Sequence, residues 1–307
     1  ARIINERTRF GSVYGIPRGG VKLAQALEKY PTILPQIAST KGKNKTFSTA
    51  VQIVGKDADG AFVEYPGIIA NQPAIEQAAV GVGITNTLPE VDGVVRRMPM
   101  VIAYDGKLYP NLAMETLRVA ANDTTFQVKI NEYGVEKMRI PKFGPVSTDS
   151  LSRIWIDWSL VPERYSLSDL PKDFNGDIVI VGVSAQGLSN PVATARGEML
   201  PQDLQASVLG TVIANKDRPI ISRPDWADGA EIIGFVLLAV ILLFLTRYVY
   251  VGLAVSVIII ICLYGGGRLG YSSYSYLIDV TIPIAGIILV SLHAYGVKFV
   301  SEFLQKQ

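Results

Sequence analysis

The chain has 307 residues, of which 29 are basic, 27 are acidic and 49% are apolar. The near balance of charge argues against the strongly basic class of nucleic-acid-binding proteins, so we expect no nucleic-acid partner. Cys262 is the only cysteine and His293 the only histidine, which excludes an intrachain disulfide and a Cys/His metal cluster. We therefore expect no metal and no cofactor in this chain. An exported domain without disulfides is unremarkable in bacteria.

The first part of the chain predicts one helix followed by short strands. Val21 to Lys29 has a helical composition, and Pro31 ends it. β-like runs bounded by turn residues follow at Thr49 to Val54, Ala61 to Tyr65 and Ala79 to Asn86.

The middle of the chain carries two hairpin signals and a helix between them. Val94 to Tyr104 alternates in hydrophobicity as a strand does, and Asp105-Gly106 is a dipeptide of tight hairpin turns. Pro110-Asn111 then opens a helix with one apolar face, made by Leu112, Ala113, Leu117 and Ala120. A second hairpin is predicted around the turn from Asn131 to Gly134, and another strand from Ser152 to Trp158.

The segment that precedes the apolar quarter of the chain predicts two helices around a buried strand. A short capped helix is expected at Ser166 to Phe174. Asp177 to Val183 (DIVIVGV) is a continuous apolar run, typical of a strand buried on both faces. Pro201 to Asn215 predicts an amphipathic helix. This alternation of strands and helices predicts an α/β fold with a mixed sheet.

Three long apolar runs dominate the last quarter and predict membrane spans at about 230–246, 250–266 and 276–296. Each approaches the ~20 residues that a helix needs to cross the hydrocarbon layer. A buried helical hairpin in a soluble core is the alternative, but three such runs in succession are rare in soluble domains. The predicted organisation is therefore a domain over residues 1–226, a three-helix membrane region over 227–297, and the start of a linker helix over 298–307.

The distribution of basic residues predicts the orientation in the membrane. Arg247 lies between the first two spans and Lys298 and Lys306 follow the third, whereas Arg268 alone lies between the second and third. Basic residues favour the cytoplasmic side. We therefore expect a multi-pass protein of the cell inner membrane, with residues 1–229 extracytoplasmic and the C-terminus cytoplasmic. The chain begins at Ala1 without an apolar leader, so we expect a natural N-terminal segment, with an export signal and a further span, upstream of it.

Several motifs resemble one family of sensors. Residues 20–226 resemble the type-2 CHASE domain, an extracytoplasmic sensory domain associated with cyclases and histidine kinases. The resemblance rests on DGVVRRMP at Asp92 to Pro99, LYPNLAMETLR at Leu108 to Arg118, the strand IWIDW, and the long stretch from Asp169 to Asn215. Three spans directly after the domain are also usual in this family. Asp177, Asn190 and Gln202 depart from its pattern.

The resemblance implies an output module on the cytoplasmic side. Similar chains continue into a class III adenylate or guanylate cyclase, a histidine kinase or a serine/threonine kinase, and the end of this chain, FVSEFLQKQ, resembles the helix that leads into a cyclase. No catalytic residue of such a module lies in residues 1–307, and Mg²⁺ and ATP would be required only if a cyclase follows. Because these outputs work as dimers, we expect a homodimer or a larger envelope assembly.

Candidate ligand-binding residues follow the DIVIVGV run. Loops beyond strand ends are the usual ligand sites of α/β sheets, so the candidates are Ser184, Gln186, Ser189, Asn190 and Thr194. The run lacks both GxxxxGK[ST] and GxGxxG, which disfavours nucleotide binding. Arg96 and Arg97 are candidates for binding an anion, although a solvated or ion-paired role at a strand end is the favoured interpretation. Glu115 and Arg118 form an ordinary helical pair worth tenths of a kcal/mol.

Two residues of the third predicted span are candidates for coupling across the membrane. Asp279 lies three residues inside that span, where a carboxylate is costly at mid-bilayer. The alternative is that it lies near the outer mouth and contacts headgroup water, at a lower cost. Pro283 is expected to kink the span without breaking it. Gly265 to Gly267 are expected to end the second span.

The function predicted from these features is transmembrane sensing, in which an unknown extracytoplasmic ligand or protein changes the state of a cytoplasmic output module. A nucleotide cyclase is the first expectation for that module. The alternative is a non-enzymatic accessory or scaffold subunit of a bacterial envelope complex that uses the sensor fold for docking. An exported hydrolase is disfavoured because one membrane-embedded histidine and no GxSxG motif leave no nucleophile and base.

Overall fold

The computed structural model describes residues 30–40, 50–55, 60–160, 162–166, 178–185, 189–217, 219–222, 234–235 and 248–305. The chain divides into two compact units, Ala1–Pro219 and Ile220–Gln307. The mixed α/β character predicted from the sequence is confirmed for the first unit, because its sheets combine parallel and antiparallel pairs.

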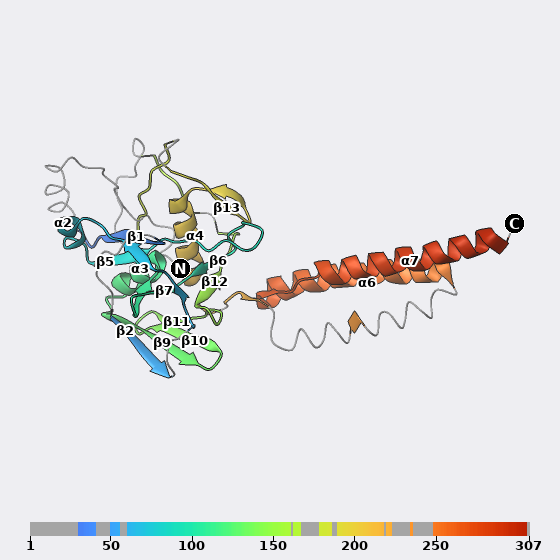
Figure 1. Cartoon of the computed structure of the whole chain (residues 1–307), viewed down its shortest axis with the longest axis horizontal. Helices are drawn as coiled ribbons and strands as arrows, with labels where there is room; N and C mark the ends of the chain where they lie inside the picture. Colours follow the sequence, from blue (N-terminus) through green and yellow to red (C-terminus); the bar gives the residue numbers. More distant parts are fainter. Residues whose placement is uncertain are drawn as a thin grey trace. The chain divides into compact units, whose positions relative to one another are not determined.

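A three-stranded sheet lies near the start of the described chain (Figure 1). Its central strand is β1 (Ile33–Ser39), with β4 (Gly67–Ile69) antiparallel on one side and β5 (Gly81–Ile84) parallel on the other. A short helix, α2 (Pro73–Glu76), lies between β4 and β5 in sequence. The prediction of a strand within Ala79 to Asn86 is confirmed by β5.

The strand expected from Val94 to Tyr104 is divided in two. β6 (Arg97–Pro99) pairs with β12 (Arg153–Trp155), whereas β7 (Val101–Tyr104) pairs with β3 (Val63–Glu64) and β8 (Lys107–Pro110). The break lies at Met100, whose N–H donates to Ser152 O. The hairpin after β7 is confirmed, since Asp105 and Gly106 both have positive φ (50° and 67°), as a tight type I′ turn requires.

A second sheet has four strands in the order β11-β10-β9-β2. β9 (Thr125–Asn131) and β10 (Gly134–Ile140) form the predicted second hairpin. β2 (Ala50–Gly55) adds parallel to β9, and β11 (Gly144–Val146), which the sequence did not indicate, adds to β10.

Two helices pack on these sheets. α3 (Leu112–Ala120) is the helix predicted after Pro110, and its N-cap Asn111 accepts a hydrogen bond from the Ala113 N–H at 2.8 Å. It approaches β5 so closely that a Cβ added to Gly83 would lie 2.4 Å from Leu112 Cα. α4 (Pro201–Ala214) is confirmed as a helix but is buried on most sides, so it is a core helix, not the expected amphipathic one. The hairpin β13 (Val192–Thr194) and β14 (Gly197–Met199) precedes it.

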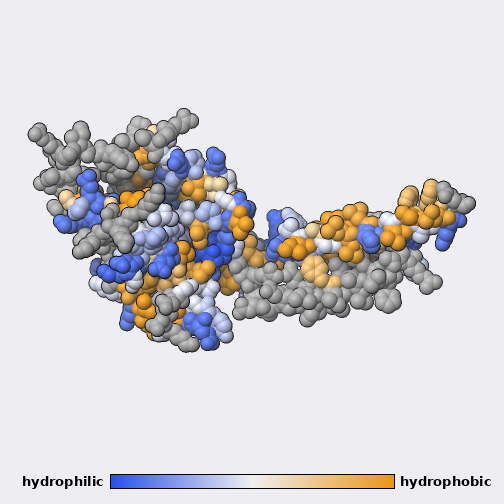
Figure 2. Space-filling model, in the orientation of Figure 1, coloured by the Kyte–Doolittle hydropathy of each residue, from blue (hydrophilic) through white to orange (hydrophobic). Residues whose placement is uncertain are grey.

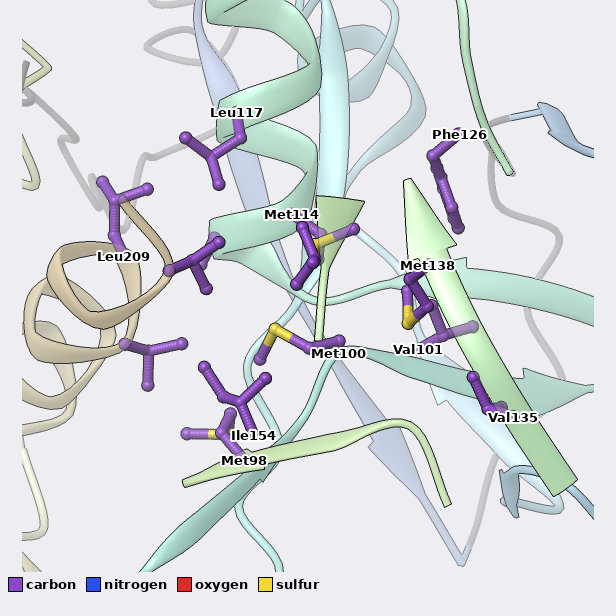
Figure 3. Packing of buried hydrophobic residues seen from close by; sticks show 14 of the residues in the cluster. Met98, Met100, Val101, Met114, Leu117, Phe126, Val135, Met138, Ile154 and Leu209 are labelled. Atoms are coloured by element: carbon purple, nitrogen blue, oxygen red, sulfur yellow. The ribbon is translucent and has the colours of Figure 1, made fainter. Parts of the chain in front are cut away.

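The main core lies between the four-stranded sheet, α3, α4 and the β6–β12 pair. Figure 3 shows Met98, Met100, Met114 and Met138 meeting there, with Leu209 facing them from α4. Unbranched methionine side chains adapt to the irregular space between elements that cross at different angles.

The prediction of a doubly buried strand at Asp177 to Val183 is wrong for the described part of that run. Residues 179–183 contain no strand, and Val181 is exposed. Ile178 and Ile180 are only half-buried against two different apolar clusters. An apolar run becomes a buried strand only where a neighbouring strand can pair with it, and composition does not supply that neighbour. The helices expected at Val21 to Lys29 and at Ser166 to Phe174 lie outside the described residues, except for Ser166 itself.

The second unit contains two long apolar helices. α6 (Val249–Tyr274) and α7 (Thr281–Gln305) are long and apolar enough to cross a membrane, over Ala254–Tyr274 and Thr281–Gln305. Figure 2 shows their apolar surface, which includes the exposed Ile261, Leu289 and Leu292. Of the first predicted span, 230–246, only Gly234 and Phe235 are described, and both are helical, so a third span stays a prediction.

The boundaries of the two described spans differ from those predicted. α6 continues through Gly265 to Gly267 as far as Tyr274, so these glycines do not end it. α7 begins only at Thr281, because Tyr276–Leu277 form a short strand, β16, that pairs with β15 (Ile221–Ser222). α7 also runs without interruption into the predicted linker helix.

Candidate functional site

The loop that holds the predicted ligand-binding residues lies against the first turn of α4. Gln202 Nε2 donates to Val183 O at 3.3 Å, and Gly182 lies so close to Gln202 that an added Cβ would come within 2.5 Å of its side chain. Ser184 and Asn190 are exposed and Ser189 is half-buried, whereas Gln186 lies outside the described residues. The structure therefore places Ser184 next to a contact with α4.

Thr194, the last of these candidates, has a structural role in the β13–β14 hairpin. Its hydroxyl donates to Gly197 O at 2.6 Å and accepts from the Arg196 N–H at 3.2 Å. Thr194 is also buried, and its backbone bridges to Val95. These contacts fix the turn of the hairpin and leave the hydroxyl oriented toward its own loop.

The start of α4 carries buried polar atoms that the sequence did not single out. Asp203 Oδ1 accepts from Arg164 Nε at 3.0 Å, while Asp203 Oδ2 has no partner among the described residues. Ser207, one turn later on the same helical face, is buried and its hydroxyl also has no such partner. Burial raises the pKa of Asp203, and the opposing effect of Arg164 does not offset it.

Gln205 points to a different side of α4 and joins the helix to the three-stranded sheet. Its Nε2 donates to Thr85 O at 3.4 Å. The Thr85 N–H and hydroxyl in turn donate to Gln36 O on β1. The polar side chains of the first two turns therefore fix α4 against neighbouring segments on two sides.

The segment after β12 follows the same face of α4 as Asp203 and Ser207. The Asp157 N–H donates to Thr211 Oγ1 at 2.9 Å, and Asn215 Nδ2 donates to Asp157 Oδ2 at 3.1 Å. Burial acts to raise the pKa of Asp157, but hydrogen bonds from Ser159 and Asn215 outweigh it, so the pKa is lowered. Asp157 and Arg164 therefore both make polar contacts with this face of α4.

Arg96 and Arg97 are ion-paired, as the favoured interpretation of the sequence expected. Arg97 contacts Glu90 at 2.6 Å and Asp149 at 3.2 Å, and its guanidinium lies 5.1 Å from the ring centroid of Trp155. Its hydrogen bonds lower the pKa of Glu90.

Arg96 contacts Asp92 at 2.7 Å near the surface, and that hydrogen bond is the main cause that lowers the pKa of Asp92 to about 2. An anion would have to compete with three carboxylates for this arginine pair.

Within the described residues, no group of three or more His, Cys, Asp or Glu side chains could hold a metal ion. The described residues around α4 offer polar side chains suited to recognising a ligand by hydrogen bonds.

The comparison with family models decides the classification. The CHASE2 domain model matches residues 6–242. This chain belongs to the CHASE2 family. CHASE2 is a sensor domain typical of signal-transduction receptors, which agrees with the resemblance seen in the sequence. Neither the curated proteins nor the solved structures gave a match.

Two apolar helices follow the CHASE2 domain, and they suggest a membrane-anchored protein. α6 and α7 run side by side (Figure 1), and between them Ser256 Oγ lies 3.1 Å from Ser291 Oγ and also donates to Gly252 O. Interhelical serine pairs of this kind contribute about 0.6–2 kcal/mol to association in membranes.

The two coupling candidates lie at the start of α7, with Asp279 just before the candidate span Thr281–Gln305 and Pro283 within its first turn. Asp279 precedes the helix, and its Oδ1 accepts from the Thr281 N–H at 2.9 Å. This places a carboxylate at the positive end of the helix dipole. Pro283 is the third residue of α7, where the missing N–H would have no intrahelical partner in any case, so a kink is not required. The prediction that placed Asp279 inside the third span is therefore wrong, because the helix starts five residues later than expected.

Proposed function

We propose that this protein is a transmembrane sensory receptor of signal transduction whose CHASE2 domain lies outside the cytoplasm. The observation that carries the proposal is the order of parts: a CHASE2 domain over residues 6–242 and, after it, two apolar helices. In this reading an extracytoplasmic ligand or protein shifts the domain between two states. It can do so only to the extent that it binds one state more tightly than the other.

We place the output of this receptor in a cytoplasmic module that α7 leads into, with an adenylate or guanylate cyclase as the first choice and Mg²⁺ and ATP as its requirements. Two observations support this choice. Chains that this sequence resembles continue into modules of that kind, and α7 is one continuous helix from Thr281 to Gln305 that extends beyond the predicted third span. A homodimer in the inner membrane fits an output that works as a dimer.

The orientation can be tested with single cysteines. In a Cys262→Ala background, Tyr133→Cys marks an exposed turn of the domain and Ser301→Cys marks an exposed site near the end of α7. A membrane-impermeant maleimide applied to spheroplasts should label the first cysteine directly and the second only after permeabilisation. Labelling of Ser301→Cys in intact spheroplasts would overturn the proposed orientation.

The output is tested on the protein extracted from its native membrane, by intact mass, by peptide coverage beyond Gln307 and by cyclic-nucleotide formation from Mg-ATP or Mg-GTP. A mass well above 33.3 kDa with peptides of a cyclase or kinase supports the receptor. A mass near 33 kDa and no nucleotide product would contradict it and favour an accessory subunit of an envelope complex.

A further inference from the structure

The second unit contains a short sheet that joins two segments distant in sequence. Ile221 pairs with Tyr276 and Ser222 with Leu277, in parallel, and the Ile221 N–H donates to Ser275 O at 3.1 Å. β15 is the segment through which the chain leaves residues 1–219, and β16 directly precedes α7. The backbone leaving the first unit is therefore hydrogen-bonded to the backbone that enters the last helix.

The turn between α6 and α7 is well fixed around this sheet. Ser275 ends α6 in the left-handed conformation (φ 57°), and its N–H donates to Tyr271 O at 2.9 Å. The rings of Tyr274 and Tyr276 stack with centroids 6.0 Å apart.

Two glycines of α6 let the turn fold back onto the helix. A Cβ on Gly267 would lie 3.0 Å from Val280 Cγ1, and one on Gly270 would lie 3.1 Å from Ile278 Cδ1. The Asp279 carboxylate accepts from the Thr281 N–H, so polar and apolar contacts hold the turn on both sides of β16.

We propose that this junction, which consists of β15, β16 and the turn 275–280, couples the segment that leaves the first unit directly to α7. The proposal rests on the proposed sensory function. A displacement of β15 would reach the start of α7 through backbone hydrogen bonds, without having to pass along the predicted first span and the whole of α6. Asp279 and Gly267 then act as positioning residues, because they hold the turn between β16 and α7.

The same junction restricts the topology of the membrane region. Backbone hydrogen bonds cannot join residues on opposite sides of ~30 Å of hydrocarbon, so Ile221 and Tyr276 must lie on one side. If α6 crosses once, the chain must cross once more between Ser222 and Tyr248. Residues 223–247 are long enough for a helical crossing at about 1.5 Å per residue. The pairing of β15 with β16 therefore supports the span predicted at 230–246 and leaves α7 to carry the chain to the opposite side.

Disulfide trapping tests the pairing itself. In the Cys262→Ala background, Ser222→Cys with Leu277→Cys places two cysteines on directly paired residues of neighbouring strands, within the usual Cα range of a disulfide. Mild oxidation of native membranes should link them, as detected by mass spectrometry of the linked peptides. The control replaces Leu277→Cys by Leu269→Cys, an exposed position on α6 outside the junction. Linkage no greater than in this control would overturn the proposal.

Hydrogen exchange tests the coupling, with Ile221→Pro and Ile221→Ala as a matched pair in the full chain in nanodiscs. The proline variant lacks the N–H that bonds Ser275 O, whereas the alanine variant retains it. Amides of residues 276–284 should exchange about five-fold or more faster in Ile221→Pro than in Ile221→Ala. Equal exchange rates would show that β15 does not hold the start of α7.

These two experiments test the junction independently of the proposed receptor function, because neither measurement needs an output module. If the disulfide forms and exchange is faster but no cyclase or kinase is found, the junction is supported and the receptor function is contradicted. If an output enzyme is found but the disulfide does not form, the receptor function is supported and the junction is contradicted.

Discussion

The structure raises the expected contribution of the Glu115–Arg118 ion pair to the stability of the domain. The sequence suggested an ordinary helical pair worth tenths of a kcal/mol, but Glu115 is fully buried and the side chain of Arg118 is only 12% exposed. The contact is bidentate, with N–O distances of 2.6 and 2.9 Å, and Arg118 also donates to Asp123 O. Removing one partner of a buried pair costs about 3–5 kcal/mol, because the other charge loses that ion pair in a poorly solvated site.

We therefore expect Arg118→Met to lower the free energy of unfolding by about 3–5 kcal/mol. Urea unfolding of the full chain in detergent, followed through the fluorescence of Trp155 and Trp158, measures this loss. The control is Lys129→Met, which removes an exposed pair with Glu136 and should cost only about 0.2–1 kcal/mol.

The double variant Glu115→Met/Arg118→Met should recover part of the loss, since no charge is then left buried. A loss of stability in Arg118→Met no larger than in Lys129→Met would show that the buried pair behaves like an exposed one.

Three further predictions concern packing and pH. Gly83→Ala should destabilise the domain by about 1–3 kcal/mol in the same assay, because the new Cβ would lie 2.4 Å from a backbone atom of Leu112; an unchanged midpoint would contradict the close packing. The hydrogen bond from Arg97 lowers the pKa of Glu90, so its stabilising contribution is present above pH 4.5 and lost as the pH falls through the lower folded value. Glu90→Gln should make the free energy of unfolding depend less on pH over that range. Burial raises the pKa of Asp203, so stability should fall as the pH rises from 3.8 through the higher folded value, and Asp203→Asn should remove that fall; a slope that persists in the variant would assign it to another group.

Local patterns in the sequence were sufficient for the elements whose geometry is set by neighbouring residues. The Asp105-Gly106 turn and the Asn111 cap were predictable because a hairpin turn and a helix start depend on backbone angles and on one side-chain hydrogen bond within a few residues. The family resemblance, carried by short motifs in a fixed order, was also visible and was confirmed by the match over residues 6–242.

The candidate site was predicted only in part. Ser184 does lie beside the first turn of α4, but Thr194 serves its own hairpin, and the buried Asp203 and Ser207 gave no signal. An aspartate in the first turn of a helix is an ordinary surface feature in sequence, because it interacts favourably with the helix dipole. Its burial in the folded domain comes from tertiary packing, which the sequence does not show.

The sequence by itself determined the composition of the chain's parts: an α/β domain of the CHASE2 family followed by apolar helices, since residue type and periodicity decide which segments avoid water. The tertiary structure alone decided which segments meet. It left the apolar run at 178–183 without a strand, buried the Glu115 carboxylate, and paired Ile221 with Tyr276. These outcomes depend on contacts that form only in the folded chain. No local pattern in the sequence encodes them, because two groups satisfy each other's hydrogen bonds or charge only once folding has brought them together.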